Sequence, residues 1–255
     1  MIKLGIAGLC GRMGYELFAC AGGSGEFEIV CGIDRDGKKP HIGCTAEIKE
    51  HPGELSVVPD LFIDFSRPEC SVQVLGYAKE KGIPVVLGTT GFTDAQKKLI
   101  EDAAASVPVV FAANFSVGVN VLLLAVEKTA AVMADSDIEI VEAHHRYKVD
   151  APSGTALAMG EAAARGRGVS LKDVKVSGRD GITGERVHGT IGFSAVRGGD
   201  IVGEHKAMFC SDGERVEIGH VAQSRATFAH GALRAARWLS GRQPGLYTMK
   251  DVLSI

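Results

Sequence analysis

A chain of 255 residues is long enough for one large domain or two modest ones. Apolar residues make up 45% of it and charged residues 23%, which is ordinary for a globular protein and excludes a disordered or collagen-like chain. The formal net charge of −3 gives no overall basic field for nucleic acid, so any anion site must be local.

The cysteines are scattered, and no two of them form a C-x-x-C pair: they are Cys10, Cys20, Cys31, Cys44, Cys70 and Cys210. This scatter is typical of reduced, mostly buried thiols. The first residues run straight into an apolar segment without the features of a signal peptide, and the apolar stretches are too short to span a membrane. We therefore expect a cytoplasmic protein.

The first half of the chain alternates short apolar runs with helical patterns. We expect strands at 2–7, 28–33, 61–65, 85–87 and 109–112, and helices at 13–21, 69–81 and 94–105. Thr93 offers an N-cap to the last of these helices. Such alternation predicts a parallel sheet with helices on both faces, that is, a doubly wound α/β fold of the Rossmann type.

The pattern changes after residue 114. We expect a long apolar helix at 119–133, a strand at 137–144, a helix at 155–165, antiparallel strands broken by glycine turns from 186 to 221, and a helix at 226–239. The sequence thus predicts a dinucleotide-binding domain at 1–114, onto which 226–255 packs back. A second α+β domain with a mixed sheet, for substrate binding and oligomer contacts, is expected at 115–225.

A glycine-rich turn follows the first strand and opens a helix, with the sequence Gly8-Leu9-Cys10-Gly11-Arg12-Met13-Gly14. Glycines at three-residue spacing permit a tight turn and the close approach of a pyrophosphate, and the helix N-terminus offers free N–H groups. The pattern is not the strict G-x-G-x-x-G. Taken alone, it also fits a glycine-rich turn that binds nothing.

Asp34 strengthens the dinucleotide hypothesis, because it ends the second strand 20 residues after Gly14. An acidic side chain there can accept hydrogen bonds from ribose hydroxyls, and the guanidinium of Arg35 can meet a 2′-phosphate. Asp34 favours NADH and Arg35 favours NADPH. We therefore expect NADH and/or NADPH as cofactor, with a solvated turn over residues 34–37 as the alternative.

Two further loops follow strands of the predicted parallel sheet. They contain Gly88, Thr89 and Thr90 in one case and Ala112, Ala113, Asn114 and Phe115 in the other. Loops at the carboxyl ends of parallel strands line the ligand crevice, so both loops can contact the nicotinamide half of the cofactor. Taken alone, each fits an ordinary turn better.

Polar chemistry is concentrated between residues 142 and 156, after a strand and before a helix. His144 and His145 are adjacent, so on an extended chain they point to opposite sides. Lys148 adds positive charge, and Ser153 can cap a helix whose N-terminus suits a carboxylate. The segment predicts a site for a small dianion beside a proton donor, with a solvated basic loop before a capped helix as the alternative. We expect no metal, since no H-x-x-x-H or cysteine partner is near.

Residues 142–145 and 148–156 resemble the signature of the dihydrodipicolinate reductase family, also called 4-hydroxy-tetrahydrodipicolinate reductases. The resemblance extends over nearly the whole chain, through residues 11–14, 63–68, 88–92, 111–118 and 198–205. It implies NAD(P)H-dependent reduction of the cyclic imine dicarboxylate dihydrodipicolinate, or 4-hydroxy-tetrahydrodipicolinate, to tetrahydrodipicolinate in lysine (diaminopimelate) biosynthesis.

The same resemblance implies a role for each matching residue. Lys148 is expected to donate a proton and His144 to donate or accept one, while His145, Gly154 and Thr155 hold the substrate. The implied cofactor-binding residues are Gly8, Leu9, Cys10, Gly11, Arg12, Met13, Asp34, Arg35, Gly88, Thr89, Thr90, Ala112, Ala113, Asn114 and Phe115. The nicotinamide would give a hydride to the imine, and Lys148, assisted by His144, would supply the proton.

Two rival functions fit parts of the pattern. An amino-acid dehydrogenase acting on an aspartate-like substrate would share the two domains but oxidise its substrate with NAD. A catalytically silent nucleotide sensor would keep the glycine loop and lose His144 or Lys148, yet both are present.

Assembly into a homotetramer through the second domain is also expected. The strands between 186 and 221 hold more apolar side chains than one covered face needs: Ile191, Phe193, Val196, Ile201, Val202, Met208 and Phe209. The family resemblance implies closed symmetry through this sheet. The alternative is a monomer in which the helix at 119–133 covers the sheet.

Overall fold

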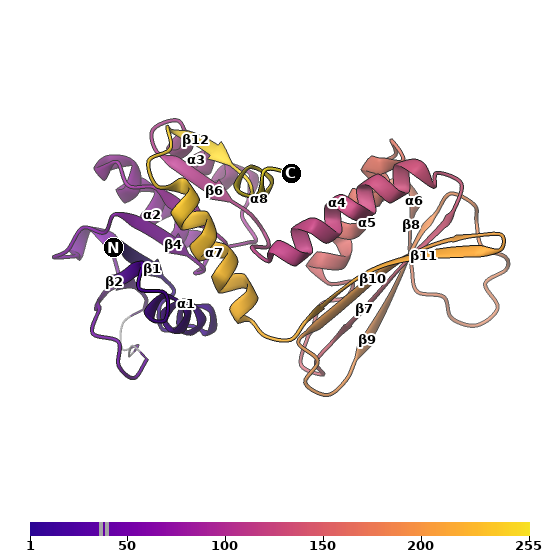
Figure 1. The fold of residues 1–255 in the computed structure, drawn as a ribbon, viewed down its shortest axis with the longest axis horizontal. Helices are drawn as coiled ribbons and strands as arrows, with labels where there is room; N and C mark the ends of the chain where they lie inside the picture. The colour runs from indigo at the N-terminus through magenta and orange to yellow at the C-terminus, as the bar shows by residue number, and fades with distance from the viewer. Residues whose placement is uncertain (36–37, 39–40) are drawn as a thin grey trace. The chain divides into compact units, whose positions relative to one another are not determined.

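The computed structural model describes residues 1–35, 38 and 41–255 (Figure 1). Of the turn considered at 34–37, Asp36 and Gly37 lie outside the described residues. The chain divides into two compact units, one formed by Met1–Val117 with Arg225–Ile255 and the other by Gly118–Ser224.

The first unit is built on a parallel sheet. Its strands are β1 (Ile2–Ala7), β2 (Phe27–Ile33), β3 (Glu47–Lys49), β4 (Leu61–Asp64), β5 (Val85–Leu87), β6 (Pro108–Phe111) and β12 (Gly245–Tyr247). They lie side by side in the order β12-β6-β5-β4-β1-β2-β3. The chain runs outward one way from β1 and the other way from β4, so the order reverses between these two strands. This reversal is the switch point of a doubly wound fold.

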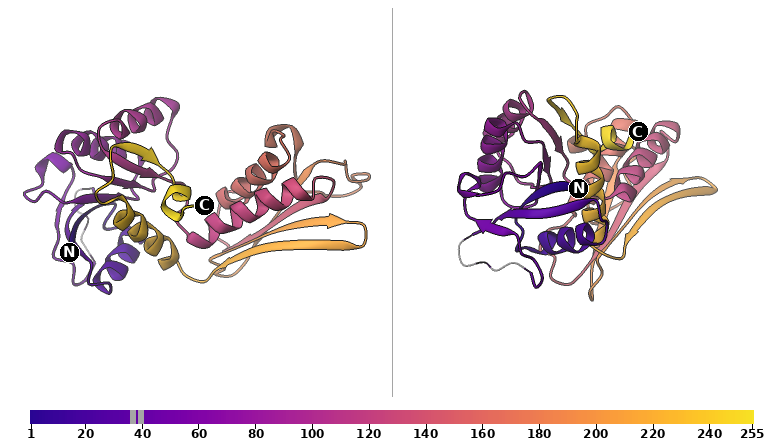
Figure 2. Two further views of the ribbon diagram at one scale, coloured as in Figure 1. Left: turned by 45° about the horizontal axis from the view of Figure 1, so that its top comes forward. Right: turned by 60° about the vertical axis from the view of Figure 1, so that its left-hand side comes forward.

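Helices cover both faces of this sheet (Figures 1 and 2). One face carries α2 (Pro68–Lys81) and α3 (Asp94–Ala104), and the other carries α1 (Arg12–Gly22), α7 (Ala226–Leu239) and α8 (Met249–Leu253). A 3-10 turn, η1 (Pro52–Glu54), precedes β4. Thr93 caps α3 as expected: its side chain accepts from the backbone N–H of Gln96, and the Gln96 side chain accepts from that of Thr93.

Small residues allow α7 to pack closely in the first unit. Ala229, Ala232, Ala235 and Ala236 are all fully buried in the core that α7 shares with β1 and β4. A Cβ on Gly231 would lie 1.8 Å from the carbonyl oxygen of Phe115, so only glycine fits there. The C-terminal segment is therefore part of the hydrophobic core of the first unit.

The second unit is built on a mixed sheet. Its strands are β7 (Asp137–His144), β8 (Lys175–Ser177), β9 (Ile191–Arg197), β10 (Gly203–Ser211) and β11 (Glu214–Ala222), in the order β11-β10-β7-β9-β8. Its helices are α4 (Val117–Val132), α5 (Gly154–Gly166) and α6 (Leu171–Val174). The predicted α/β class, a Rossmann-type parallel sheet plus a mixed sheet, is thus confirmed.

The expectation that all strands between 186 and 221 are antiparallel is wrong for β9. The pairs β10–β11 and β10–β7 are antiparallel, but β9 pairs in parallel with both β7 and β8. The glycine turn after β9 does not form a hairpin, because β7 lies between β9 and β10. This turn crosses the end of β7 instead. There the N–H of Gly198 donates to the carbonyl of His144, and the N–H of Arg146 donates to the carbonyl of Gly199.

One face of the mixed sheet is buried in the second unit. Ile138 and Ile140 on β7 pack with Leu122 and Val126 of α4 and with Met159 of α5. Ile191, Phe193 and Phe209 belong to the same core, so they are not the surplus apolar surface that the sequence suggested. On the opposite face, Val196 and Val221 are 50% and 61% exposed.

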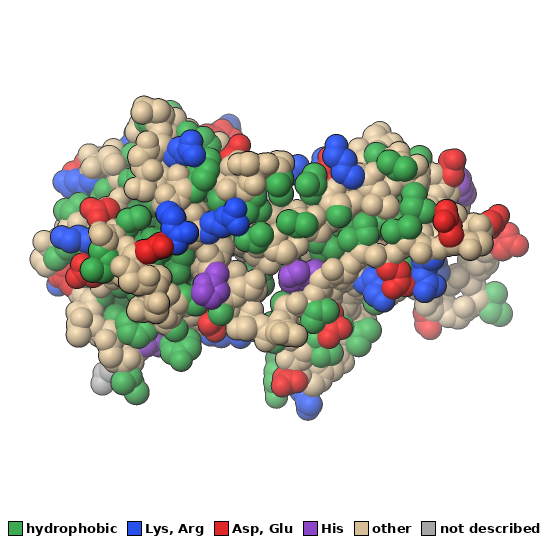
Figure 3. All heavy atoms as spheres, viewed as in Figure 1, with side chains coloured by type: hydrophobic (Ala, Val, Ile, Leu, Met, Phe, Trp, Pro, Cys, Tyr) green, Lys and Arg blue, Asp and Glu red, His purple; other side chains and the backbone are tan. Residues whose placement is uncertain are grey.

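Charged side chains of both signs are interspersed on the face drawn in Figure 3. This mixture agrees with the small net charge of −3. No helix in the described part of the chain is long and apolar enough to cross a membrane.

Candidate functional site

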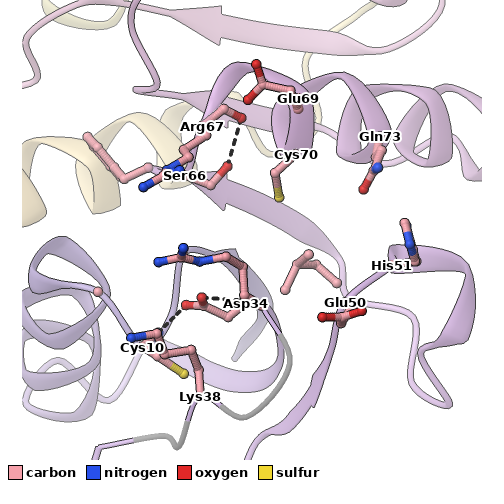
Figure 4. A pocket seen from close by; sticks show the side chains of 15 residues that line it. Cys10, Asp34, Lys38, Glu50, His51, Ser66, Arg67, Glu69, Cys70 and Gln73 are labelled. Atoms are coloured by element: carbon pink, nitrogen blue, oxygen red, sulfur yellow. Dashed lines mark hydrogen bonds between the residues drawn. The ribbon is translucent and has the colours of Figure 1, made fainter.

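A pocket of about 450 Å³ lies in the first unit at the carboxyl ends of β1, β2 and β4 (Figure 4). Its position at the switch point is where open α/β sheets bind their ligands. Five residues predicted to bind the cofactor line it: Gly8, Cys10, Gly11, Asp34 and Arg35. The predicted residues that do not line it are Leu9, Arg12, Met13, Gly88, Thr89, Thr90, Ala112, Ala113, Asn114 and Phe115.

The glycine turn is shaped by close backbone contacts. Gly8 has φ +81°, and a Cβ there would lie 2.8 Å from the carbonyl oxygen of Phe65. A Cβ on Gly14 would lie 2.1 Å from the carbonyl oxygen of Leu9. Gly11, the N-cap of α1, offers no side-chain cap, so the first-turn N–H groups of the helix remain available to an anion.

Asp34 joins the end of β2 to the glycine turn. Its Oδ2 accepts from the backbone N–H of Cys10 at 2.9 Å, and its Oδ1 accepts from that of Arg35 at 2.9 Å. A carboxylate has about four acceptor sites, so ribose hydroxyls can still be bound. Burial, followed by the nearby Asp34 carboxylate, raises the pKa of the Cys10 thiol to about 11, so this pocket residue is a neutral thiol.

A buried carboxylate braces the next loop of the pocket. Asp64, at the end of β4, accepts at Oδ1 from Ser66 Oγ at 2.6 Å and from Thr89 Oγ1 at 3.0 Å. Burial raises the pKa of Asp64, against the opposing effect of these hydrogen bonds. Thr89 therefore positions the loop that carries Ser66 and Arg67, two pocket residues that the cofactor prediction did not include. Their place after a parallel strand is the signal that would have found them.

Several residues predicted to bind the cofactor have a packing role. Leu9 is 0% exposed and Phe115 is 1% exposed, and both belong to the hydrophobic core. The ring of Phe65 meets that of Phe115 edge-on at 5.6 Å, and a Cβ on Gly88 would lie 2.2 Å from Phe65. Thr90 and Ala113, by contrast, are exposed. The side chains of Leu9 and Phe115 stabilise the fold, and any contact they make with a ligand is through their backbone.

The residues present in the pocket fit a dinucleotide. The glycine cradle and the uncapped helix N-terminus suit a pyrophosphate, and the Asp34 carboxylate suits ribose hydroxyls. Arg35, Lys38 and Arg67 bring three positive charges to the pocket wall, where they suit phosphate groups. Figure 4 shows Asp34 and Lys38 on one side of the pocket and Ser66 and Arg67 on the other.

A polar cluster in the second unit contains the predicted catalytic histidine. His144 Nδ1 lies 2.6 Å from Oε2 of Glu142, whose side chain is only 1% exposed. Both oxygens of Glu142 also accept from Arg197, each at 2.7 Å. Burial favours the neutral acid, but the hydrogen bonds from Arg197, His144 and Ser153 outweigh it and hold the pKa of Glu142 below its usual value.

Ser153 links this cluster to α5 and to a second histidine. Its Oγ caps α5 by accepting from the N–H of Ala156 at 3.2 Å, as expected, and lies 2.9 Å from Nε2 of His205. Burial, followed by the neighbouring His144, lowers the pKa of His205 to about 4. His205, which the sequence prediction missed, is therefore a neutral ring at pH 7, and it stacks edge-on against His144 with ring centroids 5.0 Å apart.

Lys148 lies in the loop between β7 and α5. Its Nζ donates to both oxygens of Asp150, at 2.8 and 2.9 Å, and its side chain is 20% exposed. The hydrogen bond from Lys148 lowers the pKa of Asp150. The ammonium is thus held by one carboxylate and remains accessible at the surface of the loop.

The predicted substrate-binding residues lie at the two ends of the same loop. His145 follows β7 directly, and Gly154 and Thr155 form the first turn of α5. A Cβ on Gly154 would meet no atom within 4 Å, so there is open space beside Gly154 in the first turn of α5. Among the described residues, no three His, Cys, Asp or Glu side chains are grouped to hold a metal ion.

Two family models match almost the whole chain. The model described as dihydrodipicolinate reductase, N-terminus, matches residues 2–115, and that of the C-terminus matches residues 118–253. Among solved structures, the dipicolinate-bound dihydrodipicolinate reductase from Paenisporosarcina sp. TG-14 is 23% identical, with 97% of each chain covered and a TM-score of 0.80.

More distant structures share the fold. A myo-inositol dehydrogenase from Corynebacterium glutamicum ATCC 13032 is 13% identical, with 94% of this chain and 89% of that chain covered and a TM-score of 0.56. GenD2 from gentamicin A biosynthesis, in complex with NAD, is 10% identical, with 99% of this chain and 90% of that chain covered and a TM-score of 0.61.

A Rossmann-type unit whose switch-point pocket has residues that fit a dinucleotide, followed by a second unit with a mixed sheet, is typical of NAD(P)-dependent oxidoreductases. The chain belongs to the dihydrodipicolinate reductase family. It is accordingly an NAD(P)H-dependent reductase of lysine and diaminopimelate biosynthesis. The predicted family, fold class and enzyme activity are confirmed. The family match favours this reductase activity over the amino-acid dehydrogenase and the silent nucleotide sensor that were the alternatives.

Proposed function

We propose that this chain reduces the cyclic imine dicarboxylate dihydrodipicolinate, or its hydrated 4-hydroxy form, to tetrahydrodipicolinate. The observation that carries the proposal is the loop between β7 and α5, where a histidine, a lysine and the N-terminus of α5 occur within one family-matched unit. Dipicolinate, a dicarboxylate, is bound in the structurally similar reductase from Paenisporosarcina. A helix N-terminus and a lysine are the groups that carboxylates prefer.

In this proposal, His145, Gly154 and Thr155 hold the dicarboxylate, and Lys148 donates the proton that completes the reduction. His144 donates or accepts a proton beside it. The dihydronicotinamide, when bound, supplies the hydride. The positive charge of Lys148 stabilises the negative charge that develops on the substrate during reduction.

The cofactor is assigned to the first unit, through the glycine turn, Asp34 and Arg35, and the loops at 88–90 and 112–115. This gives a dinucleotide-binding domain at 1–114 with 226–255, and a substrate-binding and tetramerisation domain at 115–225. The compact units end within a few residues of these bounds, which supports the assignment. The free cysteines support a cytoplasmic location.

Both NADH and NADPH are expected to serve, with kcat/KM values that differ by about tenfold or less. The Asp34 carboxylate suits free ribose hydroxyls and repels a 2′-phosphate, while Arg35 and Lys38 offset that repulsion. The assay follows consumption of each cofactor while the preceding enzyme generates the substrate in place from pyruvate and aspartate semialdehyde. No consumption of either cofactor would contradict the proposed function.

Arg35→Ala separates the two cofactors in the same assay. Loss of a charge-assisted hydrogen bond of about 1.5–3 kcal/mol raises KM for NADPH by about 10–100-fold and leaves KM for NADH nearly unchanged. Arg242→Ala is the matched control, because Arg242 is an exposed arginine of the same unit that does not line this pocket. A thousandfold preference of the wild type for either cofactor would show that Asp34 and Arg35 do not balance each other.

A homotetramer formed through the open face of the mixed sheet is also proposed. Val196 and Val221 are half exposed or more on this face, in a row of paired residues whose other members are Ala143 and Glu204. Exposed apolar side chains on the face of a sheet can be covered by a second copy of the chain. Light scattering with size exclusion is expected to give about four times the chain mass of 26.8 kDa.

Val196→Asp places a charge in this row and is expected to lower the measured mass. Val132→Asp is the control, because Val132 is 85% exposed at the end of α4 and lies off the sheet. A wild-type mass near that of one chain refutes the tetramer, and a mass near twice that value shows a dimer instead.

A further inference from the structure

A buried ion pair lies at the centre of the polar cluster in the second unit. The guanidinium of Arg197 donates one hydrogen bond to each oxygen of Glu142, and the Glu142 side chain is 1% exposed. Such a bidentate pair fixes the plane of both groups. Because Glu142 is held as a carboxylate, it can only accept hydrogen bonds.

Three segments of the candidate substrate site converge on this pair. Glu142 accepts from the ring of His144 at 2.6 Å and from the backbone N–H of Ser153, directly before Gly154, at 3.1 Å. Arg197 donates to the backbone carbonyl of Asp150 at 2.7 Å. Asp150 in turn holds the ammonium of Lys148. One ion pair therefore anchors the histidine, the lysine loop and the start of α5.

The contact with Glu142 also decides where His144 carries its proton. An acceptor-only carboxylate requires Nδ1 to donate, so the neutral ring has its lone pair on Nε2. Nε2 lies above the start of β10, where a Cβ on Gly203 would come within 3.1 Å of it. The absence of a side chain at Gly203 leaves room beside this nitrogen.

We infer that Glu142, clamped by Arg197, is a positioning residue that holds His144 in the Nδ1–H tautomer and directs proton exchange to Nε2. The inference rests on the proposed role of His144 as a proton donor or acceptor. Glu142 contacts the ring on the side away from Nε2 and does not itself exchange the proton. Arg197 keeps Glu142 ionised and ties the lysine loop to it.

The test combines histidine NMR with kinetics on the full-length protein. Long-range proton–nitrogen correlation on protein labelled with ¹⁵N-histidine identifies the tautomer, and the His144→Asn spectrum assigns the signal. The wild type is expected to show Nδ1–H at His144. In Glu142→Gln, this preference is lost and kcat falls by about 10–100-fold, the usual effect of removing a carboxylate that orients a histidine. The dissociation constant for NADH stays within about twofold.

Glu127→Gln is the matched control. It makes the same chemical change in the same unit, at the ion pair with Arg165 between α4 and α5, and is expected to alter neither the tautomer nor kcat. Arg197→Lys keeps the charge but loses the bidentate geometry, so an intermediate loss of kcat is expected.

Two results would overturn the inference. The first is an Nε2–H tautomer at His144 in the wild type, a measurement that does not depend on the folding of any variant. The second is a Glu142→Gln enzyme that keeps the wild-type tautomer and the wild-type kcat. Failure of the underlying proposal looks different. If His144→Asn turns over like the wild type, His144 has no role in the reaction, while the measured effect of Glu142 on the tautomer stands.

Discussion

Replacing Lys148 with alanine is expected to lower kcat by about 10²–10⁴-fold while NADH binding stays nearly intact. The loss follows from the proposed mechanism, in which the Nζ ammonium of Lys148, held by Asp150, gives a proton to the reduced substrate. NADH binding is spared because the glycine turn and Asp34 belong to the other unit. Steady-state kinetics and fluorescence titration with NADH measure the two quantities.

Lys172→Ala controls for the loss of a lysine from the second unit. Lys172 is exposed on α6, away from the open face of the mixed sheet, so its removal is expected to change kcat by less than about twofold. A Lys148→Ala enzyme with near-wild-type kcat would rule out a proton-donating role for Lys148. A large loss of NADH affinity would show that this residue acts on the cofactor instead.

Gly14→Ala is expected to weaken NADH binding by about 10²-fold and to destabilise the first unit by about 1–3 kcal/mol. The added Cβ would lie 2.1 Å from the carbonyl oxygen of Leu9 and 2.5 Å from that of Gly8, and backbone cannot rotate away as a side chain can. The turn must shift, and a displacement of about 1 Å at a binding group costs about this much. NADH titration and urea unfolding measure the two effects.

Gly22→Ala provides the control in the same helix. Gly22 is the last residue of α1, and a Cβ there would meet no atom within 4 Å. Alanine is expected to leave NADH binding unchanged and to stabilise the helix by up to about 1 kcal/mol. If Gly14→Ala bound NADH as tightly as Gly22→Ala does, the close contact with Leu9 would not shape the cofactor site.

The long elements were predictable because their local patterns agree with their final environment. The bounds of β1, β7 and α7 coincide with those expected from apolar runs and helical spacing, and Thr93 caps α3 as predicted. The short strands β3, β8 and β12 were not predicted. Each has only three residues and lacks the continuous apolar run that revealed the equally short β5, and each forms by pairing with the edge of a neighbouring strand.

The site was predictable where function depends on a local motif. The glycine turn, Asp34 and Arg35 line the pocket because a strand-to-helix turn and the end of the next strand meet by the rules of the fold. The same motif also included Leu9, which is a core residue. In a glycine turn, residue type alone does not show which side chains point inward, so the sequence could not separate lining residues from packing residues.

By itself, the sequence determined the family, the strand–helix alternation that predicts a parallel first sheet, and the segment from the end of β7 to the start of α5 that contains His144, Lys148 and Thr155. All three depend on residues near one another in the chain. Only the tertiary structure decided that β7 lies between β9 and β10. It also decided that Arg197 reaches Glu142 across 55 residues. Strand order and buried ion pairs are set by packing between residues far apart in the chain. The sequence around a carboxylate does not indicate which distant residue pairs with it.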